Sequence, residues 1–138
     1  MKEVILMDTG PLVALYNARD EHHKWVCEQM QRMPDEVITC EPVLTEACFL
    51  LARARTSPTR ILQAVRRGIL KPSFEIADEA AALETLMSRY ADTPMSLADA
   101  CLVRLSEIHR DCRIFTLDRD FKHYRRFGRS VIPVLSPW

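Results

Sequence analysis

The sequence has no CxxC pair, no long apolar run and no excess of charge of one sign. Its 5 Cys are odd in number and scattered, which excludes a disulfide framework and indicates reduced thiols. No window is apolar enough to span a membrane, and the N-terminal apolar run is too short for a signal peptide. We therefore expect a cytoplasmic protein with no membrane partner. Lys plus Arg and Asp plus Glu number 19 each, so the total charge does not indicate a strongly basic nucleic-acid binder.

Internal repeats, low-complexity tracts and interdomain linkers are also absent. The composition that remains is ordinarily globular, with 48% hydrophobic and 28% charged residues. A chain of 138 residues is long enough to bury a core of its own. We therefore expect a single domain over residues 1–138.

The N-terminal segment is organised as a strand, an acid and a helix. Residues 4–7 are four apolar residues in a row, which is typical of a strand buried on both faces. Asp8 follows at once, and Gly10-Pro11 then predicts a turn and the start of a helix over 11–18. Asp8 therefore lies at the carboxyl end of a central strand, which is where open α/β sheets hold their ligands.

Strands and helices alternate along the rest of the chain. The patterns predict further strands at 37–40, 74–77, 113–117 and 131–135, and further helices at 21–30, from 41, at 59–68, at 79–90 and from 96. Asp78 is the expected N-cap of the helix at 79, and Gly68 the expected C-cap of the helix before it. This alternation predicts a parallel sheet with right-handed crossovers and helices on both faces, an α/β fold.

Four acids share one kind of position, either at a strand end or in the first turns of the following helix: Asp8, Glu46, Asp99 and Asp118. Each has a structural explanation by itself. Asp8 and Asp118 fit N-caps, Glu46 fits the favourable end of a helix dipole, and Ser96-x-x-Asp99 fits a capping box.

Taken together, the four acids favour a functional site. The carboxyl ends of neighbouring parallel strands meet at one edge of a sheet, and two charges about 4 Å apart repel by about 4 kcal/mol at an effective dielectric of 20. A bound cation relieves such repulsion. Because the ligands are all oxygen and no His or Cys is interleaved, Mg²⁺ or Mn²⁺ is favoured over Zn²⁺.

The motifs around these acids resemble those of the PIN-domain ribonucleases, and in particular the toxin members of the VapC type. The matching segments are 8–15, Thr45-Glu46, 96–100 and 115–121, in family order and with family-like separations. The resemblance covers essentially the whole chain and implies a three-layer α/β/α PIN-like domain with a short parallel sheet of four to five strands.

The same resemblance implies a function. It implies a Mg²⁺-dependent endoribonuclease (Mn²⁺ is the alternative ion) that leaves 5′-phosphate and 3′-hydroxyl ends and acts as the toxin of a toxin–antitoxin pair. It implies a homodimer, and a small antitoxin protein lying across a helical hairpin. The implied catalytic and metal-binding residues are Asp8, Glu46, Asp99 and Asp118, with Asp120 as an auxiliary acid and Thr116 as a polar neighbour of the metal. Asp92 matches a further acid of the family, although it is explained equally well as an ordinary loop residue.

Other interpretations stay open beside this one. A catalytically inactive PIN-like module that binds RNA or protein is the main alternative, and the intact set of acids argues against it. A haloacid-dehalogenase-like phosphatase needs a second Asp two residues after the first, where this chain has Gly10. The spacing of His22, His23 and Cys27 would suit a metal on a helix, but no second pair accompanies it. A basic group within 53–67 is either a phosphate- or partner-binding surface or a solvated helix face. A second basic group near Asp118 is better placed for RNA and consists of Arg119, Lys122, Arg125, Arg126 and Arg129.

Overall fold

The computed structural model describes residues 3–34 and 36–138. Its main sheet has five parallel strands in the order β3-β2-β1-β4-β7, so the N-terminal strand lies at the centre. The strands of this sheet are β1 (Val4–Met7), β2 (Val37–Thr39), β3 (Lys71–Pro72), β4 (Cys112–Phe115) and β7 (Val134–Leu135). The predicted parallel α/β sheet is confirmed.

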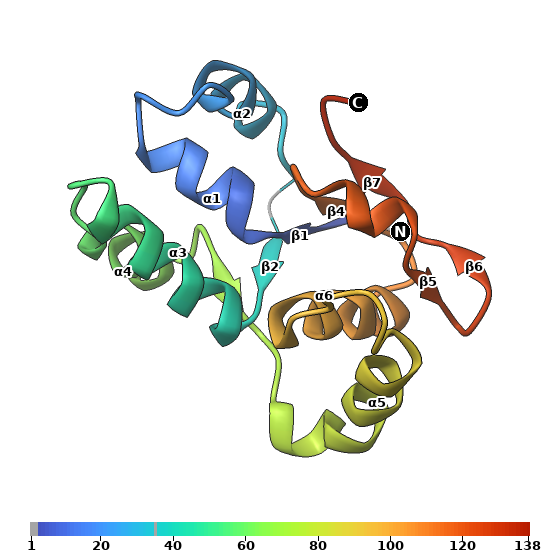
Figure 1. The fold of residues 1–138 in the computed structure, drawn as a ribbon. Helices are drawn as coiled ribbons and strands as arrows, with labels where there is room; N and C mark the ends of the chain where they lie inside the picture. Colours follow the sequence, from blue (N-terminus) through green and yellow to red (C-terminus); the bar gives the residue numbers. More distant parts are fainter. Residues whose placement is uncertain (1–2, 35) are drawn as a thin grey trace.

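Helices cover both faces of this sheet, as Figure 1 shows: α1 and α2 lie on one side, and α5 and α6 on the other. The helices are α1 (Thr9–Tyr16), α2 (His23–Met30), α3 (Glu41–Arg53), α4 (Thr59–Arg66), α5 (Ile76–Arg89) and α6 (Leu97–Ile108). A 3₁₀ turn, η1 (Arg119–Lys122), follows β4. None of the helices within the described ranges is long and apolar enough to cross a membrane.

The centre of the core is β1, all four residues of which are buried. Its residues pair on both sides, since Ile5 lies opposite Val37 of β2 and Arg113 of β4. A strand with neighbours on both edges and helices on both faces has almost no contact with water, which is why its sequence is apolar without alternation. Whatever follows β1 is therefore held at the middle of the sheet edge.

Two of the expected elements are wrong. The segment 74–77 is not a strand: β3 is at Lys71–Pro72, paired with β2, and α5 already begins at Ile76. The strand ends early because β2 itself stops at Thr39, so residues beyond Pro72 have no backbone to pair with. Asp78 consequently lies in the first turn of α5 and does not cap it; the N-cap is Glu75.

The predicted strand 131–135 is divided in two. Ser130–Val131 form β6, which pairs in an antiparallel hairpin with β5 (Arg125–Arg126), and only Val134–Leu135 join the main sheet as β7. The carbonyl of Pro133 accepts a hydrogen bond from the Ile114 amide (2.9 Å), so the proline enters the sheet at its outer edge. The hairpin β5–β6 has no counterpart in the sequence prediction.

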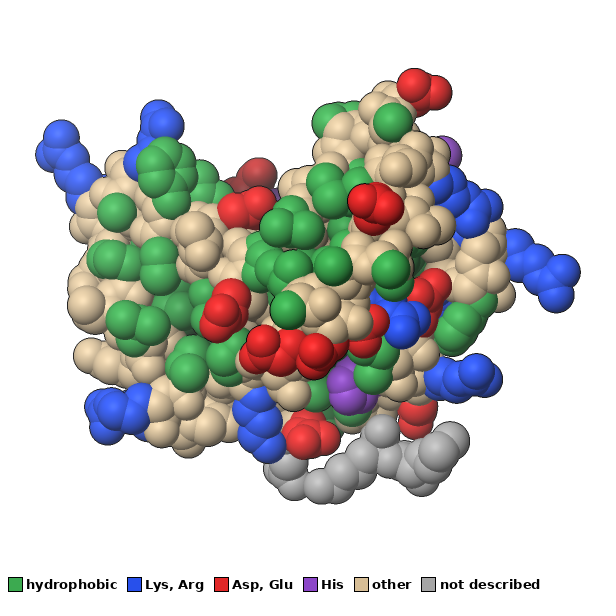
Figure 2. Space-filling view, turned by 90° about the horizontal axis from the view of Figure 1, so that it is seen from below, with side chains coloured by type: hydrophobic (Ala, Val, Ile, Leu, Met, Phe, Trp, Pro, Cys, Tyr) green, Lys and Arg blue, Asp and Glu red, His purple; other side chains and the backbone are tan. Residues whose placement is uncertain are grey.

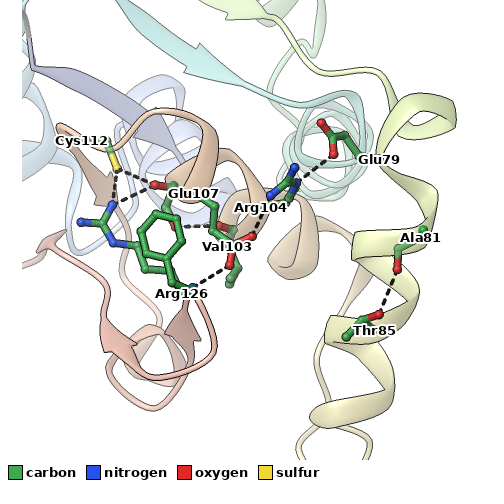
Figure 3. Close-up of polar contacts among 10 residues, drawn as sticks. Glu79, Ala81, Thr85, Val103, Arg104, Glu107, Cys112 and Arg126 are labelled. Atoms are coloured by element: carbon green, nitrogen blue, oxygen red, sulfur yellow. Dashed lines mark hydrogen bonds and ion pairs between the residues drawn. The ribbon is translucent and has the colours of Figure 1, made fainter.

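Side-chain contacts fix α6 between α5 and the hairpin (Figure 3). Arg104 of α6 donates to Glu79 of α5 (2.8 Å) and to Glu107 one turn further along α6 (3.1 Å). On the other side, the Nη1 of Arg126 donates to the Ser106 carbonyl at 2.8 Å. These contacts fix the position of α6, and therefore of the acid near its N-terminus, relative to α5 and the hairpin.

Candidate active site

The four acids that the sequence singled out line one pocket of about 500 Å³ at the carboxyl edge of the sheet. Asp8 follows β1, Glu46 lies in the second turn of α3, Asp99 lies in the first turn of α6, and Asp118 follows β4. Residues 19 to 110 positions apart in the sequence are thus brought to a common site by the topology of the sheet. The other lining residues are Thr9, Gly10, Leu117, Arg119 and Trp138.

Asp8 is held by hydrogen bonds to both of its carboxylate oxygens. As the N-cap of α1 it accepts from the Thr9 amide (2.7 Å), and its second oxygen accepts from the Thr116 hydroxyl (2.6 Å). Pro11 follows in the first turn, where a missing N–H costs no intrahelical bond. The Asp8 carboxylate therefore caps α1 and also lines the acidic pocket.

Burial raises the pKa of Asp8 from its ordinary value of 3.8 to about 7. The hydrogen bonds from Thr116 and Thr9 act in the opposite direction, and the charges of Asp99 and Asp118 add to the rise. Desolvation thus outweighs the two bonds that favour the ionised form. A carboxyl group in this condition is strongly stabilised by a nearby positive charge.

Asp99 accepts two hydrogen bonds through one carboxylate oxygen, Oδ2. Ser96 and Asp99 form the predicted capping box, in which the Asp99 amide donates to the Ser96 hydroxyl (3.0 Å) and the Ser96 amide to Asp99 Oδ2 (3.3 Å). The same Oδ2 accepts from the Tyr124 hydroxyl at 3.0 Å. Among the described residues no donor contacts Oδ1. Burial is the largest cause that raises the pKa of Asp99. Burial is also the largest cause that raises the pKa of Tyr124, and the nearby charge of Asp99 adds to that rise.

Glu46 and Asp118 are exposed and are tied to the buried part of the site by two threonines. The Thr9 hydroxyl donates to Glu46 Oε2 at 3.0 Å. The Thr116 hydroxyl, which donates to Asp8, also accepts from the Asp118 amide at 2.9 Å. Thr116 was expected as a polar neighbour of a metal; in the structure it lies between two of the acids.

The two further acids lie outside this pocket. Asp120 donates its amide to Asp118 Oδ1 (2.9 Å) from within η1, and its charge contributes to the raised pKa of Tyr124. It thus adjoins the site as an auxiliary acid would. Asp92 is exposed and lines a different pocket, with Tyr90 and His123 among its neighbours.

The donor set fits a hard divalent cation, because all four side chains are carboxylates. Burial raises the pKa values of two of them, Asp8 and Asp99. As the side chains stand, no three His, Cys, Asp or Glu of residues 3–34 and 36–138 approach closely enough to enclose an ion. Binding would therefore draw the four carboxylates inward. Asp8 and Asp99 are the nearest to preformed ligands, since hydrogen bonds fix both.

Sequence reasoning missed three lining or supporting residues. Tyr124, Thr9 and Trp138 stand in no motif that gave them a role, and only Thr9 carried a local signal, since it directly follows Asp8. Tyr124 reaches Asp99 because Phe121 and Tyr124 pack edge to face (5.3 Å between ring centroids) after β4. Trp138 reaches the pocket because β7 ends beside β4.

The charge is unevenly distributed over the surface. Figure 2, which looks onto the α5–α6 face, shows acidic side chains gathered over that face and Lys and Arg at its sides. The exposed arginines of the α3–α4 hairpin are Arg53, Arg55, Arg60, Arg66 and Arg67. In the second basic group, Arg126 is a structural residue, because its Nη1 donates to the carbonyls of Ser106 and Arg110. The expectation of Arg126 as an RNA contact is therefore not supported.

The residues on and before α2 whose spacing would suit a metal, His22, His23 and Cys27, form local contacts instead. The His23 ring nitrogen contacts the Ala14 carbonyl at 2.7 Å, and Cys27 Sγ lies 3.6 Å from His23 Nε2. His22 instead pairs with Glu21 and packs against Trp138. His22 and His23 thus point to different partners.

Comparison with known proteins places these features in a family. A family model described as the PIN domain matches residues 5–126. The chain is similar to Ribonuclease VapC26 of Mycobacterium tuberculosis, with 28% identity over 136 residues that cover 95% of this chain and 99% of that protein. It also resembles the crystal structure of M. tuberculosis VapC20, described as a sarcin–ricin loop cleaving toxin, with a TM-score of 0.76 and 24% identity over 94% of this chain and 99% of that one. The second likeness concerns the fold.

Proposed function

The chain belongs to the PIN-domain family, and from that premise we propose that it is a Mg²⁺-dependent endoribonuclease and the toxin of a toxin–antitoxin pair. The observation that carries the proposal is the pocket at the carboxyl edge of the sheet, where Asp8, Glu46, Asp99 and Asp118 meet. The similarity to Ribonuclease VapC26 over nearly the whole of both chains supports RNA as the substrate.

In this proposal the four acids hold the ion, and the surrounding residues hold the acids. Asp8 and Asp99 are the inner ligands because hydrogen bonds from Thr116 and Tyr124 fix their orientation. Glu46, kept in place by Thr9, and Asp118 complete the site directly or through water. A bound Mg²⁺ supplies activation of a water molecule and stabilisation of the charge that builds on the phosphate.

The chain's own contribution to hydrolysis is therefore positioning and charge. The carboxylates would orient the scissile phosphate indirectly, through the Mg²⁺ ion that they hold, and no side-chain nucleophile is required. Products with 5′-phosphate and 3′-hydroxyl ends are expected by resemblance to the family. We further propose that the chain acts as a single domain over residues 1–138, in the cytoplasm, as a homodimer restrained by a small antitoxin.

The decisive experiment compares wild type with Asp8→Asn and Asp99→Asn on the same RNA. Wild type should cleave in Mg²⁺ and stop in EDTA, and both variants should lose cleavage while keeping a cooperative thermal unfolding transition. Glu84→Gln, an exposed carboxylate on α5, is the matched control and should cleave as wild type does. Sequencing of the cleavage ends then identifies the end chemistry. Cleavage that persists in both aspartate variants would refute the assignment.

The toxin role has a separate test. Expression of the wild-type chain by itself should arrest growth of a bacterial host, and expression of Asp8→Asn should not. If wild-type expression were harmless while cleavage in vitro was intact, the ribonuclease activity would stand and the toxin role would fall. If neither cleavage nor growth arrest occurred, the alternative of an inactive RNA- or protein-binding PIN-like module would replace the proposal.

A further inference from the structure

Trp138 and Arg119 form one wall of the acidic pocket. The guanidinium of Arg119 lies over the Trp138 ring, 4.7 Å from its centroid, and both residues line the same pocket as Asp8, Asp99 and Asp118. The Trp138 side of this pair is 39% exposed, and the ring is further positioned by an edge contact with His22, 5.6 Å between centroids. The two side chains thus form a stacked aromatic and cationic pair, partly open to solvent, beside the carboxylates.

This wall is not explained by packing. Trp138 and Arg119 both stay outside the buried core. Arg119 follows Asp118 directly, yet within the described ranges it forms no ion pair with any carboxylate. Within the same ranges it is also the one cationic side chain that lines this pocket. A cation that avoids four neighbouring carboxylates and lies on an indole is left available for an anion from solution.

We propose that Trp138 and Arg119 together bind the nucleotide next to the scissile phosphate, with Trp138 stacking on its base and Arg119 contacting its backbone. This assignment rests on the proposed ribonuclease function. Single-stranded RNA is recognised by stacking of unpaired bases on aromatic rings and on guanidinium planes. The wall offers both, with the guanidinium stacked over one face of the ring, in the same pocket as the acids. A base on this wall would fix the register of the RNA over the acids.

The charge of the pocket gives Arg119 a second purpose. An RNA phosphate approaching four carboxylates is repelled until a cation intervenes. Arg119 lies at the pocket margin and offers a positive charge to the phosphate that flanks the one to be cleaved. Binding to this wall should therefore depend on salt through Arg119 and on the presence of a base through Trp138.

The test uses the fluorescence of Trp138. The chain has 2 Trp, and Trp25 packs edge to face on Phe115, so Trp25→Phe leaves Trp138 as the single reporter with little change in packing. We would add Asp8→Asn to prevent cleavage and titrate a short, unstructured single-stranded oligoribonucleotide of mixed sequence. Stacking should quench the fluorescence saturably, and the same oligonucleotide with abasic positions should quench much less.

Substitutions separate stacking from charge. Trp138→Ala should weaken binding about tenfold, measured by anisotropy of a labelled oligonucleotide, and Trp138→Phe should restore most of the loss because a ring is retained. Arg119→Gln should lower the slope of log affinity against log salt by about 1. Thermal unfolding of each variant should match that of its parent, since both side chains lie at the surface.

The failure of this inference is distinguishable from failure of the proposed function. If wild type cleaves RNA but Trp138 is not quenched, or if Trp138→Ala binds RNA as tightly as its parent, the ribonuclease stands and the stacking wall is wrong. If Trp138 is quenched and Trp138→Ala weakens binding, but no cleavage occurs in Mg²⁺, the wall stands and the ribonuclease is wrong.

Discussion

Asp8 is both the N-cap of α1 and the most deeply buried of the four pocket carboxylates. Two hydrogen bonds favour its ionised form, and burial disfavours that form by more. The raised pKa is thus a measure of stability given up in order to keep a carboxylate at the centre of the sheet edge. A residue selected only for capping would not need to be buried in this way.

The cost of this burial can be measured through the pH dependence of stability. The folded-state pKa of Asp8, about 7, lies above its unfolded value of 3.8, so the folded protein binds more protons between these values and stability falls as pH rises through that window. Asp8→Asn is neutral throughout, so its free energy of unfolding in EDTA should exceed that of wild type at pH 8, by at most about 4 kcal/mol. The excess should shrink towards pH 4.

Urea unfolding at the two pH values gives this difference directly. Glu84→Gln, which alters an exposed carboxylate that does not line the pocket, should leave the pH dependence of stability as in wild type. If Asp8→Asn were no more stable than wild type at pH 8, the carboxylate would not be under the strain that its burial indicates.

Tyr124 supports Asp99 without lining the pocket. Its hydroxyl donates to Asp99 Oδ2, and its ring is buried against Phe121 and Tyr90. Tyr124→Phe keeps the ring and removes the bond, so the fold should persist with about 1 kcal/mol of lost stability. RNA cleavage in Mg²⁺ should fall about tenfold, the lower range for loss of a residue that orients a metal ligand.

A matched variant separates this effect from general loss of stability. Tyr16→Phe removes a hydroxyl at the far end of α1, where Arg60 packs over the ring. That variant should cleave RNA at the wild-type rate. Equal rates for Tyr124→Phe and wild type would show that Asp99 needs no support from Tyr124.

The acids and Thr116 could be predicted from the sequence, whereas the aromatic residues near them could not, and the reason is physical. An acid placed between an apolar strand and a helix is conspicuous, because a charge in that setting is costly without a purpose. Tyr124 and Trp138 are ordinary in their local sequence, since an aromatic residue in an irregular segment has many uses. Their position at the site depends on how the chain after β4 folds back, through η1, the β5–β6 hairpin and β7, which no local pattern encodes.

At the scale of elements, the first turn of α1 and the loop after β4 fit closely together. A Cβ at Gly10 would lie 3.2 Å from the Leu117 Cβ, tighter than ordinary contact. Leu117 stands between Thr116 and Asp118, so the space next to Gly10 sets the position of two site residues. Gly10 is required here for close approach between two elements.

Gly10→Ala should therefore displace the loop that holds Thr116 and Asp118. Ala is favoured over Gly in a helix by about 1 kcal/mol, and this gain opposes the cost of the close contact with Leu117. The net change in stability should therefore be small, whereas RNA cleavage should fall severalfold. The double variant Gly10→Ala/Leu117→Ala relieves the contact and should recover part of the activity that Gly10→Ala loses. A Gly10→Ala protein with wild-type cleavage would show that the loop position does not matter to the site.

The elements that were predicted correctly are those whose signal is long or strongly apolar. The strand at β1 and the capping box of α6 were found because each is a local pattern with one structural meaning. The strand expected at 74–77 was wrong because residues 76–77 already belong to α5, while the true β3 is a two-residue pairing with β2. A pairing that short has no periodicity to detect, and only the neighbouring strand determines it.

At the scale of the whole molecule, the balanced net charge conceals a separation of charges. Exposed arginines occupy the α3–α4 hairpin, acids gather over the α5–α6 face, and the acidic pocket lies at the carboxyl edge of the sheet. The total charge therefore gave no sign of a nucleic-acid site, because the acids that would serve the chemistry cancel the bases that would attract the RNA. The parallel sheet converts acids on four separate segments into a single site.

The proposed Mg²⁺ site predicts that the ion stabilises the whole domain against unfolding. An ion bound only by the folded protein stabilises it by about 2.7 kcal/mol at a concentration 100 times its Kd. Thermal unfolding in increasing MgCl₂, at constant ionic strength maintained with KCl, should show a Tm that rises with Mg²⁺ for wild type and for Glu84→Gln. The rise should be absent in Asp99→Asn, which should retain the fold but lacks the carboxylate that α6 contributes to the pocket. If Asp99→Asn gained as much as wild type, the ion would bind elsewhere, and the pocket would not be the site at which the four segments are joined.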